Sequence, residues 1–272
     1  MKKILFVSFC LFLLLCLYFS DKGYAIQLPG GMTVNKTLPL GGQTSGNIVI
    51  ANNGKEAETV RIYQTDYMFS ADGKNNFGSP GSMPRSNAKW IKFTPNQVTV
   101  APGEETSIFY EIAVPKTSDL RGTYWSVIMV EPIPQDALKP PNPKKDKATI
   151  GVQAVFRHAV QMITHIENTG TRALQFSNKA LKAQAHKTFL TIDVENVGER
   201  WLVPQLYVDV ADSGGNAMKR YEGKKFRIYP GCSARYVIDL GKLNSGKYNA
   251  LVIADSGENE KVFGARYILD VK

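Results

Sequence analysis

The stretch from Trp90 to Glu131 decides the fold class. It reads Trp90-Ile-Lys-Phe-Thr-Pro95, Val98-Thr-Val-Ala-Pro-Gly103, Ile108-Phe-Tyr-Glu-Ile-Ala-Val-Pro115 and Gly122-Thr-Tyr-Trp-Ser-Val-Ile-Met-Val-Glu131. From Ile108 onward every second residue is apolar, which is the period of a strand buried on one face. Ala101-Pro-Gly-Glu104 is a turn, because proline presets one turn position and glycine supplies the positive φ beside it. The stretch therefore predicts strand, turn, strand, loop and strand.

The same pattern extends outward in both directions. Before the stretch we expect strands at residues 32–38, 47–51 and 59–66, and a long loop or weak hairpin at 70–89. After it we expect strands at 190–195, 206–210, 236–240 and 261–271, with one or two helical turns at 180–187.

Signals from the first half recur in the second half in the same order. Asn52-Asn-Gly54 corresponds to Asn196-Val-Gly198, Pro102-Gly103 to Pro230-Gly231, and Gly122-Thr-Tyr124 to Gly246-Lys-Tyr248. This order suggests two copies of one unit, although such turns are common in all-β proteins. Short strands without βαβ spacing predict an all-β chain of two tandem immunoglobulin-like sandwiches, at residues 26–167 and 168–272.

Residues 1–25 have the features of a cleaved signal peptide. Lys2 and Lys3 precede an apolar run at 4–19, and Gly23-Tyr-Ala25 offers small residues for cleavage before Ile26. A lipoprotein acylated at Cys16 is the alternative, less favoured because the preceding Leu15 is bulky. No second apolar run is long enough to span a bilayer, so we expect a soluble periplasmic chain, or alternatively a surface or secreted one.

Cysteine and charge content narrow the function classes. Removal of residues 1–25 leaves only Cys232, so no internal disulfide can form. The formal net charge is +9, with basic clusters at 139–147 and 219–227. No nucleic-acid-binding motif accompanies them, so solvated loops or contact with an anionic surface are the interpretations.

No catalytic or metal-binding pattern stands out. The three histidines, His158, His165 and His186, do not form a zinc-binding pair. There is no nucleophile elbow and no phosphate-binding loop. We therefore expect no enzyme activity, no metal and no cofactor.

Two features suit the binding of another protein. The strand from Gly122 is apolar on both faces, and Trp125, Val127 and Met129 on one face could line a groove for a partner. The second feature is a run of alternating apolar residues, Ile150, Val152, Ala154 and Phe156. If this run lies at a sheet edge, its side chains could complete a partner's core by strand addition. The alternative is that both are ordinary core strands, covered by the second domain or by the loop at 132–147.

These residues carry a resemblance to the PapD-like periplasmic pilus chaperones. It covers residues 32–166 best and rests on Ile48-Val-Ile-Ala-Asn-Asn53, Phe93-Thr-Pro95, Val98-Thr-Val-Ala-Pro-Gly103 and Val152-Gln-Ala-Val-Phe156. The second domain matches in architecture only. The resemblance implies two immunoglobulin-like domains at an angle, in the periplasm, lending a strand to unfinished pilin subunits.

The same resemblance implies a pair of basic residues that hold the subunit's terminal carboxylate. The first matched position is Lys36 and the second is Gln161, which is uncharged; Arg157 is basic and nearby. A carboxylate would therefore keep one cation of the usual pair and lose the other.

Three hypotheses follow. The first is a chaperone-like protein that binds an exported pilin-like or surface subunit by strand addition, and the second is a structural protein of a surface or extracellular assembly. The third, ranked last, is a carbohydrate-active or carbohydrate-binding module that uses Trp90, Trp125 or Trp201 as a sugar platform.

Overall fold

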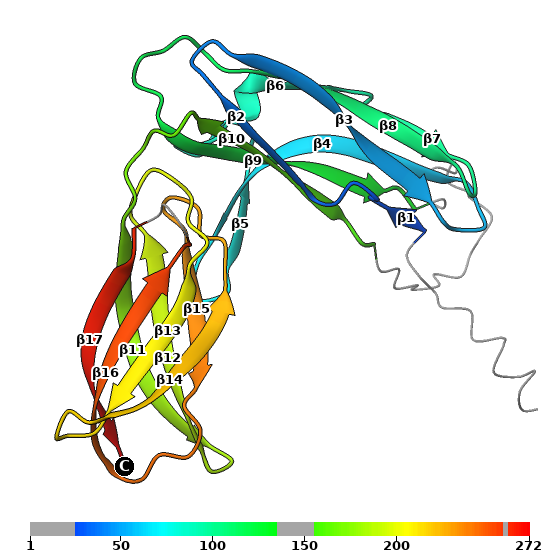
Figure 1. Cartoon of the computed structure of the whole chain (residues 1–272). Helices are drawn as coiled ribbons and strands as arrows, with labels where there is room; N and C mark the ends of the chain where they lie inside the picture. The colour runs from blue at the N-terminus through cyan, green and yellow to red at the C-terminus, as the bar shows by residue number, and fades with distance from the viewer. Residues whose placement is uncertain (1–24, 135–154, 258–260) are drawn as a thin grey trace, which may run out of the picture.

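The computed structural model describes residues 25–134, 155–257 and 261–272, which form two β-sandwiches set at an angle (Figure 1). This confirms the predicted fold class. The only helix in the described ranges is a 3-10 turn, η1 (Ala88–Trp90). Residues 1–24, which hold nearly all of the predicted signal peptide and the alternative acylation site Cys16, lie outside the description.

The first domain consists of two sheets. One has the order β1 (Ile26–Gln27), β3 (Gln43–Asn52), β8 (Glu105–Ala113) and β6 (Ile91–Thr94). The other has the order β2 (Thr33–Leu38), β10 (His158–Ile166), β9 (Gly122–Pro132), β4 (Glu58–Phe69) and β5 (Asn75–Gly78), and β7 (Gln97–Val100) also pairs with β4. The pair β2–β10 is parallel, whereas the other pairs are antiparallel.

The second domain repeats the two-sheet plan. Its sheets have the orders β11 (Leu174–Gln184), β12 (Lys187–Asn196), β15 (Ser233–Asp239), and β14 (Ala217–Lys225), β13 (Gln205–Ala211), β16 (Gly246–Asp255), β17 (Phe263–Val271). The prediction of helical turns at 180–187 was wrong. Ala185 and His186 have φ of 48° and 63°, so they turn the chain tightly between two paired strands. Pairing with β12 overrides the helical propensity of the local residues.

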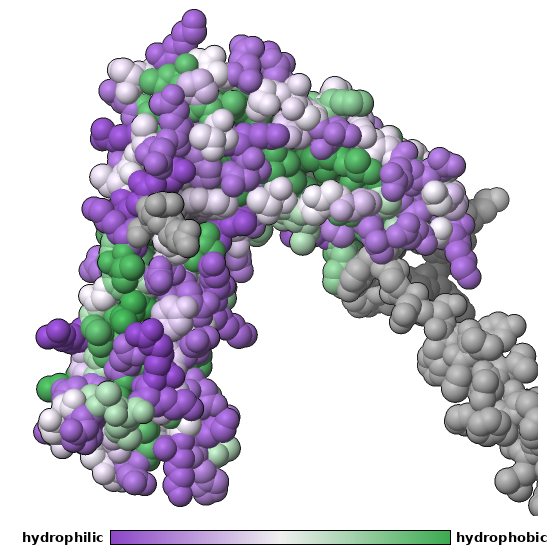
Figure 2. All heavy atoms as spheres, viewed as in Figure 1, coloured by the Kyte–Doolittle hydropathy of each residue, from purple (hydrophilic) through white to green (hydrophobic). Residues whose placement is uncertain are grey.

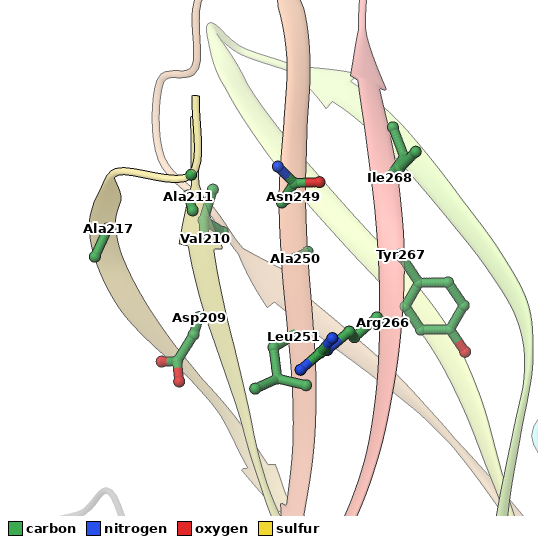
Figure 3. A pocket seen from close by; sticks show the side chains of 11 residues that line it. Asp209, Val210, Ala211, Ala217, Asn249, Ala250, Leu251, Arg266, Tyr267 and Ile268 are labelled. Atoms are coloured by element: carbon green, nitrogen blue, oxygen red, sulfur yellow. The ribbon is translucent and has the colours of Figure 1, made fainter. Parts of the chain in front are cut away.

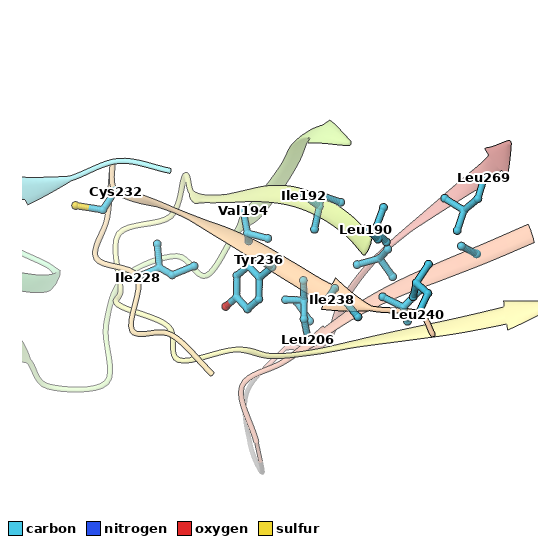
Figure 4. Packing of buried hydrophobic residues seen from close by; sticks show 14 of the residues in the cluster. Leu190, Ile192, Val194, Leu206, Ile228, Cys232, Tyr236, Ile238, Leu240 and Leu269 are labelled. Carbon is cyan, nitrogen blue, oxygen red and sulfur yellow. The ribbon is translucent and has the colours of Figure 1, made fainter. Parts of the chain in front are cut away.

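Each sandwich encloses its own apolar core. The core of the second domain includes Leu190, Ile192, Leu206, Tyr236 and Ile238, each of them fully buried (Figure 4). The first core lies between the sheets of β3 and β8 on one side and β4, β9 and β10 on the other.

Each domain has a buried asparagine whose side chain makes the same three hydrogen bonds to the backbone, here called the asparagine clasp. The Nδ2 of Asn52 donates to the Val100 and Glu56 carbonyls, at 2.9 and 2.7 Å, and its Oδ1 accepts from the Gly54 N–H. Asn196 makes the corresponding bonds to the Ile228 and Arg200 carbonyls and the Gly198 N–H. Both side chains are fully buried, so the turns that recur in the sequence have the same hydrogen bonds. This equivalence supports the prediction of two copies of one unit.

The segment at 70–89 is a hairpin followed by an ordered loop, which was one of the two predicted alternatives. Strand β5 pairs with the end of β4, Asp66 opposite Gly78. The buried Asp66 carboxylate accepts hydrogen bonds from the Met83 N–H at 2.9 Å and the Ser86 hydroxyl at 2.5 Å. These bonds hold the loop against the end of β4.

The two domains meet through aromatic stacking and backbone hydrogen bonds. Trp125 of β9 stacks on Tyr229 of the second domain, with ring centroids 4.6 Å apart and planes 14° apart. The Thr123 N–H donates to the Glu199 carbonyl at 2.8 Å, and the Trp201 N–H donates to the Thr123 hydroxyl at 2.9 Å. The junction is therefore packed like a core rather than joined by a flexible linker.

Gly122 allows this close approach, which gives a testable prediction. It has φ of 77°, and a Cβ there would lie 2.1 Å from the Glu199 carbonyl oxygen. We expect Gly122→Ala to lower the free energy of unfolding by more than about 2 kcal/mol, measured by urea denaturation. Gly103→Ala is the matched control, because Gly103 has φ of 75° but open space around it, and should cost about 1 kcal/mol. Equal losses would contradict a steric role for Gly122.

Candidate functional site

The predicted groove residues lie together on the face of the β2–β10–β9–β4–β5 sheet that is turned toward the second domain, here called the cleft face. Trp125 is paired with Ile163, Val127 with Gln161, and Met129 with Ala159. All three predicted residues are buried, being 4%, 1% and 4% exposed. Trp125 is covered by Tyr229, so in this structure the three side chains do not form an open groove. Their part in partner binding stays a prediction.

The predicted partner-binding strand is described only at its end. Ile150, Val152 and Ala154 lie outside the described residues. Phe156 is 49% exposed and lies two residues before β10 begins at His158. The strand assignment for 150–156 therefore stays a prediction.

The first part of β10 has an open edge. Strand β2 pairs with β10 only from Gln161 to Ile166, and the Gln161 N–H donates to the Met32 carbonyl at 2.9 Å. Within the described residues, His158–Val160 pair with β9 alone. Backbone groups alternate along a strand, so the N–H and C=O of Ala159 point to the same side as those of Gln161. That side of Ala159 faces no strand in the described chain.

The two basic residues named from the sequence, Lys36 and Arg157, lie apart from each other in the structure. Lys36 lies in β2 opposite Thr164, on the face of Val34 and Leu38, which pack against the first core. It therefore points away from the cleft face. Arg157 contacts the Tyr63 hydroxyl at 3.4 Å, and that hydroxyl donates to Glu131 at 2.7 Å. The structure does not bring Lys36 and Arg157 together, and their role as carboxylate anchors stays a prediction.

A different cation reaches the cleft face at Gln161. Arg227 of the second domain donates from its guanidinium to the Gln161 Oε1 at 3.1 Å and to the Thr33 hydroxyl at 3.4 Å. Its guanidinium also lies over the Trp201 ring, 4.4 Å from the centroid. The Tyr229 hydroxyl donates to the same Gln161 oxygen. We call Gln161, Arg227 and Tyr229 the junction cluster.

The junction cluster holds a cation among neutral groups. The Nε of Arg227 is buried without a hydrogen-bond partner, and among the described residues no carboxylate forms an ion pair with this side chain. Burial raises the pKa of Tyr229 to about 12, so its hydroxyl stays neutral and can donate. Sequence reasoning placed Arg227 only in a basic cluster at 219–227, because nothing in the sequence indicates its contact with Gln161.

The rest of that basic cluster lies on β14, where Lys219, Arg220, Lys224 and Lys225 are exposed. Arg220 forms a bidentate ion pair with Asp209, at 2.6 and 2.7 Å. Contact of these residues with an anionic surface stays a prediction.

The tryptophans named as a sugar platform are engaged within the fold. Trp90 packs on Tyr124 with centroids 4.6 Å apart, Trp125 on Tyr229, and Trp201 under Arg227. These contacts favour a structural role for all three rings.

A hollow on the second domain lies away from these residues. It has a volume of about 620 Å³ and lies on the outer face of the β14–β13–β16–β17 sheet, beside Asp209, Leu251, Arg266 and Ile268 (Figure 3). No residue predicted to bind a partner lines it. No three His, Cys, Asp or Glu side chains of the described ranges gather as a metal site would require, and no helix there is long and apolar enough to cross a membrane.

His165 is a buried titratable group at the domain junction. It is 3% exposed, its Nδ1 lies 2.9 Å from the Thr123 hydroxyl, and its ring contacts Trp201. Burial and the positive charges of Arg200 and Arg227 lower the pKa of His165 to about 4. The unfolded chain, in which histidine titrates near 6.5, therefore binds more protons than the folded chain between these values.

This difference predicts that acid weakens the fold. The stabilisation is complete above about pH 6.5 and is lost as the pH falls toward 4, by about 1–3 kcal/mol in the free energy of unfolding. We expect His165→Gln to remove the part of this dependence between pH 5 and 6.5, measured by urea denaturation at several pH values. His158→Gln, on the same strand, serves as the control. An unchanged pH profile in His165→Gln would contradict the assignment.

Comparison with known proteins gives matches only among solved structures. No protein-family model matches the sequence, and no curated protein matches it. A chain from the structure of a chaperone–tip adhesin complex of CFA/I fimbriae biogenesis is 15% identical, with 89% of this chain and 97% of that chain covered and a TM-score of 0.48.

Two further matches are also chains from structures of pilus or fimbrial chaperones. The class 5 fimbriae chaperone CfaA is 13% identical, with 89% and 98% covered and a TM-score of 0.46. A chain of the CsuC–CsuE chaperone–tip adhesion subunit complex of Acinetobacter baumannii is 11% identical, with 84% and 93% covered and a TM-score of 0.42. All three matched chains come from structures of fimbrial chaperones or their complexes, and the matches cover 84–89% of this chain.

Proposed function

We propose that the protein is a periplasmic chaperone that binds an exported, unfinished β-sandwich subunit by strand addition. The observation that carries this proposal is the open edge of β10 at His158–Val160, next to the exposed Phe156. Free edges are normally covered or blunted, because an unpaired ladder captures other chains. An edge left open beside alternating apolar residues is suited to pairing with a partner strand.

In the proposed complex residues 150–156 extend β10. Ile150, Val152, Ala154 and Phe156 have the same parity as Val160 and Met162, whose side chains point into the first core. Side chains at even positions of one strand share a face. In the proposed complex the apolar side chains of this face would complete the core of the subunit.

The junction cluster would hold the carboxylate at the end of the subunit. Arg227 is partly buried, and within the described part of the chain its hydrogen-bond partners, Gln161 and Thr33, are neutral. A carboxylate would give it a charge-assisted, bidentate partner, which is stronger than a neutral amide oxygen. The second domain would thus supply the cation that position 161 lacks.

The alternative is a permanent structural component of a surface assembly. The same open edge would then hold a neighbouring molecule in a finished fibre. A free monomeric pool in the periplasm favours the chaperone, whereas stable sedimentation with the cell envelope or fibres favours the structural protein.

The strand assignment predicts the loss of partner capture on mutation. We expect the double variant Val152→Lys and Phe156→Lys to lose capture of a small exported β-rich subunit, because lysine side chains cannot fill an apolar core. The measurement is a pull-down of the tagged mature protein from its own cell envelope, with mass spectrometry of the bound protein.

Phe109→Lys is the control, because Phe109 is 60% exposed on the other sheet. It should capture the subunit as the unchanged protein does. Unaltered capture by the double variant would remove the strand-donor assignment, and a protein found only in envelope fibres would favour the structural alternative.

The junction cluster makes a separate prediction. A peptide with the last residues of the captured subunit and a free carboxylate should bind about tenfold more tightly than the same peptide ending in an amide, because only the carboxylate pairs with Arg227. In Arg227→Gln the two peptides should bind equally, as measured by isothermal titration calorimetry.

Arg61→Gln is the control for Arg227, because Arg61 is an arginine on β4, in the sheet that carries Gln161, but it is already paired with Glu131 at 3.2 Å. The difference between the two peptides should survive in that variant. A wild-type protein that binds both peptides equally would contradict the role of Arg227.

A further inference from the structure

A second hollow lies beside the open edge of β10. It has a volume of about 420 Å³ and is lined mainly by apolar side chains, among them Ile26, Leu28, Pro29 and Met32, with His158 at its border. Met32 is 54% exposed, whereas Ile26 is 2% exposed and belongs to the first core. Figure 2 shows hydrophobic residues gathered on the first domain between β3 and the segment that carries β1 and β2. The hollow is thus an opening toward the core.

The change of sheet between β1 and β2 produces this opening. Strand β1 pairs with β3 in one sheet, and β2 pairs with β10 in the other. The connection turns at Gly31, which has φ of 80° and donates its N–H to the Leu28 carbonyl at 3.0 Å. The seam between the sheets is therefore crossed by a short turn and not closed by a continuous strand.

We infer that this hollow receives an apolar side chain of the strand that a partner adds to β10. The inference rests on the proposed function. A strand added at the open side of Ala159 would lie about 4.8 Å from β10, and every second side chain of it would face the interior of the sandwich. Because the seam is open there, an inward side chain would enter the hollow between Leu28 and Met32.

The lining selects the chemistry of that side chain. The one titratable group at the hollow, His158, is already in contact with the Ile26 carbonyl, with its Nε2 2.9 Å away. Apart from Gln27, the other side chains of the lining are aliphatic, so a charged side chain would lose its water without gaining an ionic partner. A large aliphatic or aromatic side chain suits the site. The hollow would therefore make binding depend on the residue at one position of the partner's strand.

Met32 is the residue through which to test the inference. Its side chain is half exposed in the free protein, so a change there should leave the fold intact. We expect Met32→Lys to weaken binding of the subunit identified by pull-down at least tenfold, and Met32→Leu to bind within about twofold of the unchanged protein. Phe109→Lys again serves as the control for an exposed apolar residue elsewhere.

An environment-sensitive dye at position 32 gives a second readout. In the chain without residues 1–25 the one other thiol is Cys232, which is fully buried, so Met32→Cys can be labelled selectively. Addition of the subunit should shift the dye emission to the blue, and a dye at Phe109→Cys should show no such shift.

The outcomes separate the two proposals. If the unchanged protein captures the subunit but Met32→Lys binds it equally well and the dye does not respond, the hollow has no role and the inference is overturned. A dye that reports an apolar environment before the subunit is added would mean that the chain's own residues fill the hollow, which also overturns it. If the unchanged protein captures no subunit, the proposed function itself fails.

Discussion

The stacking of Trp125 on Tyr229 is the contact on which the arrangement of the molecule depends. It joins the middle of a first-domain sheet to the core of the second domain, since both rings belong to one apolar cluster. The indole N–H of Trp125 donates to the Tyr67 carbonyl at 2.7 Å, which also fixes the end of β4. From there Phe69 packs edge-on against Tyr229, and the Ala71 N–H donates to the Ser233 hydroxyl. One aromatic pair thus orients a hairpin and two domains.

The rigidity of this junction determines which surfaces are available. Because Trp125 and Val127 are covered, the middle of the cleft face serves as internal packing, and the proposed binding groups lie at its margins. The margins are the open edge of β10 on one side and Arg227, held over Trp201, on the other. A partner that used both would be positioned by backbone pairing at one end and by charge at the other. This division suits a subunit whose chain is extended and whose terminus is anionic.

Local patterns in the sequence were sufficient for the fold but insufficient for the site. Alternation at 108–114 and the recurring Asn-x-Gly turns reflect short-range physics, and the structure contains the corresponding strands and the Asn52 and Asn196 clasps. The contact of Arg227 with Gln161 depends on how two domains pack across 66 positions of sequence, and periodicity carries no information about it. The resemblance names Lys36, whose role as an anchor stays a prediction; β2 places that side chain on the face of the first core. At 180–187 the composition favoured a helix, and pairing with β12 imposed a strand.

An open edge is an aggregation hazard, and the structure indicates how a protein can keep one without pairing with its own copies. Within the described residues the unpaired stretch of β10 is only His158–Val160, too short for a stable ladder between two identical edges. The net positive charge of the chain adds repulsion between copies. Self-association would gain a few backbone hydrogen bonds and less apolar burial than a subunit with an unfilled core, because each copy already packs its own two cores. A partner with an incomplete core would offer both, and under the proposed function the edge would therefore favour such a partner over a second copy of the chain.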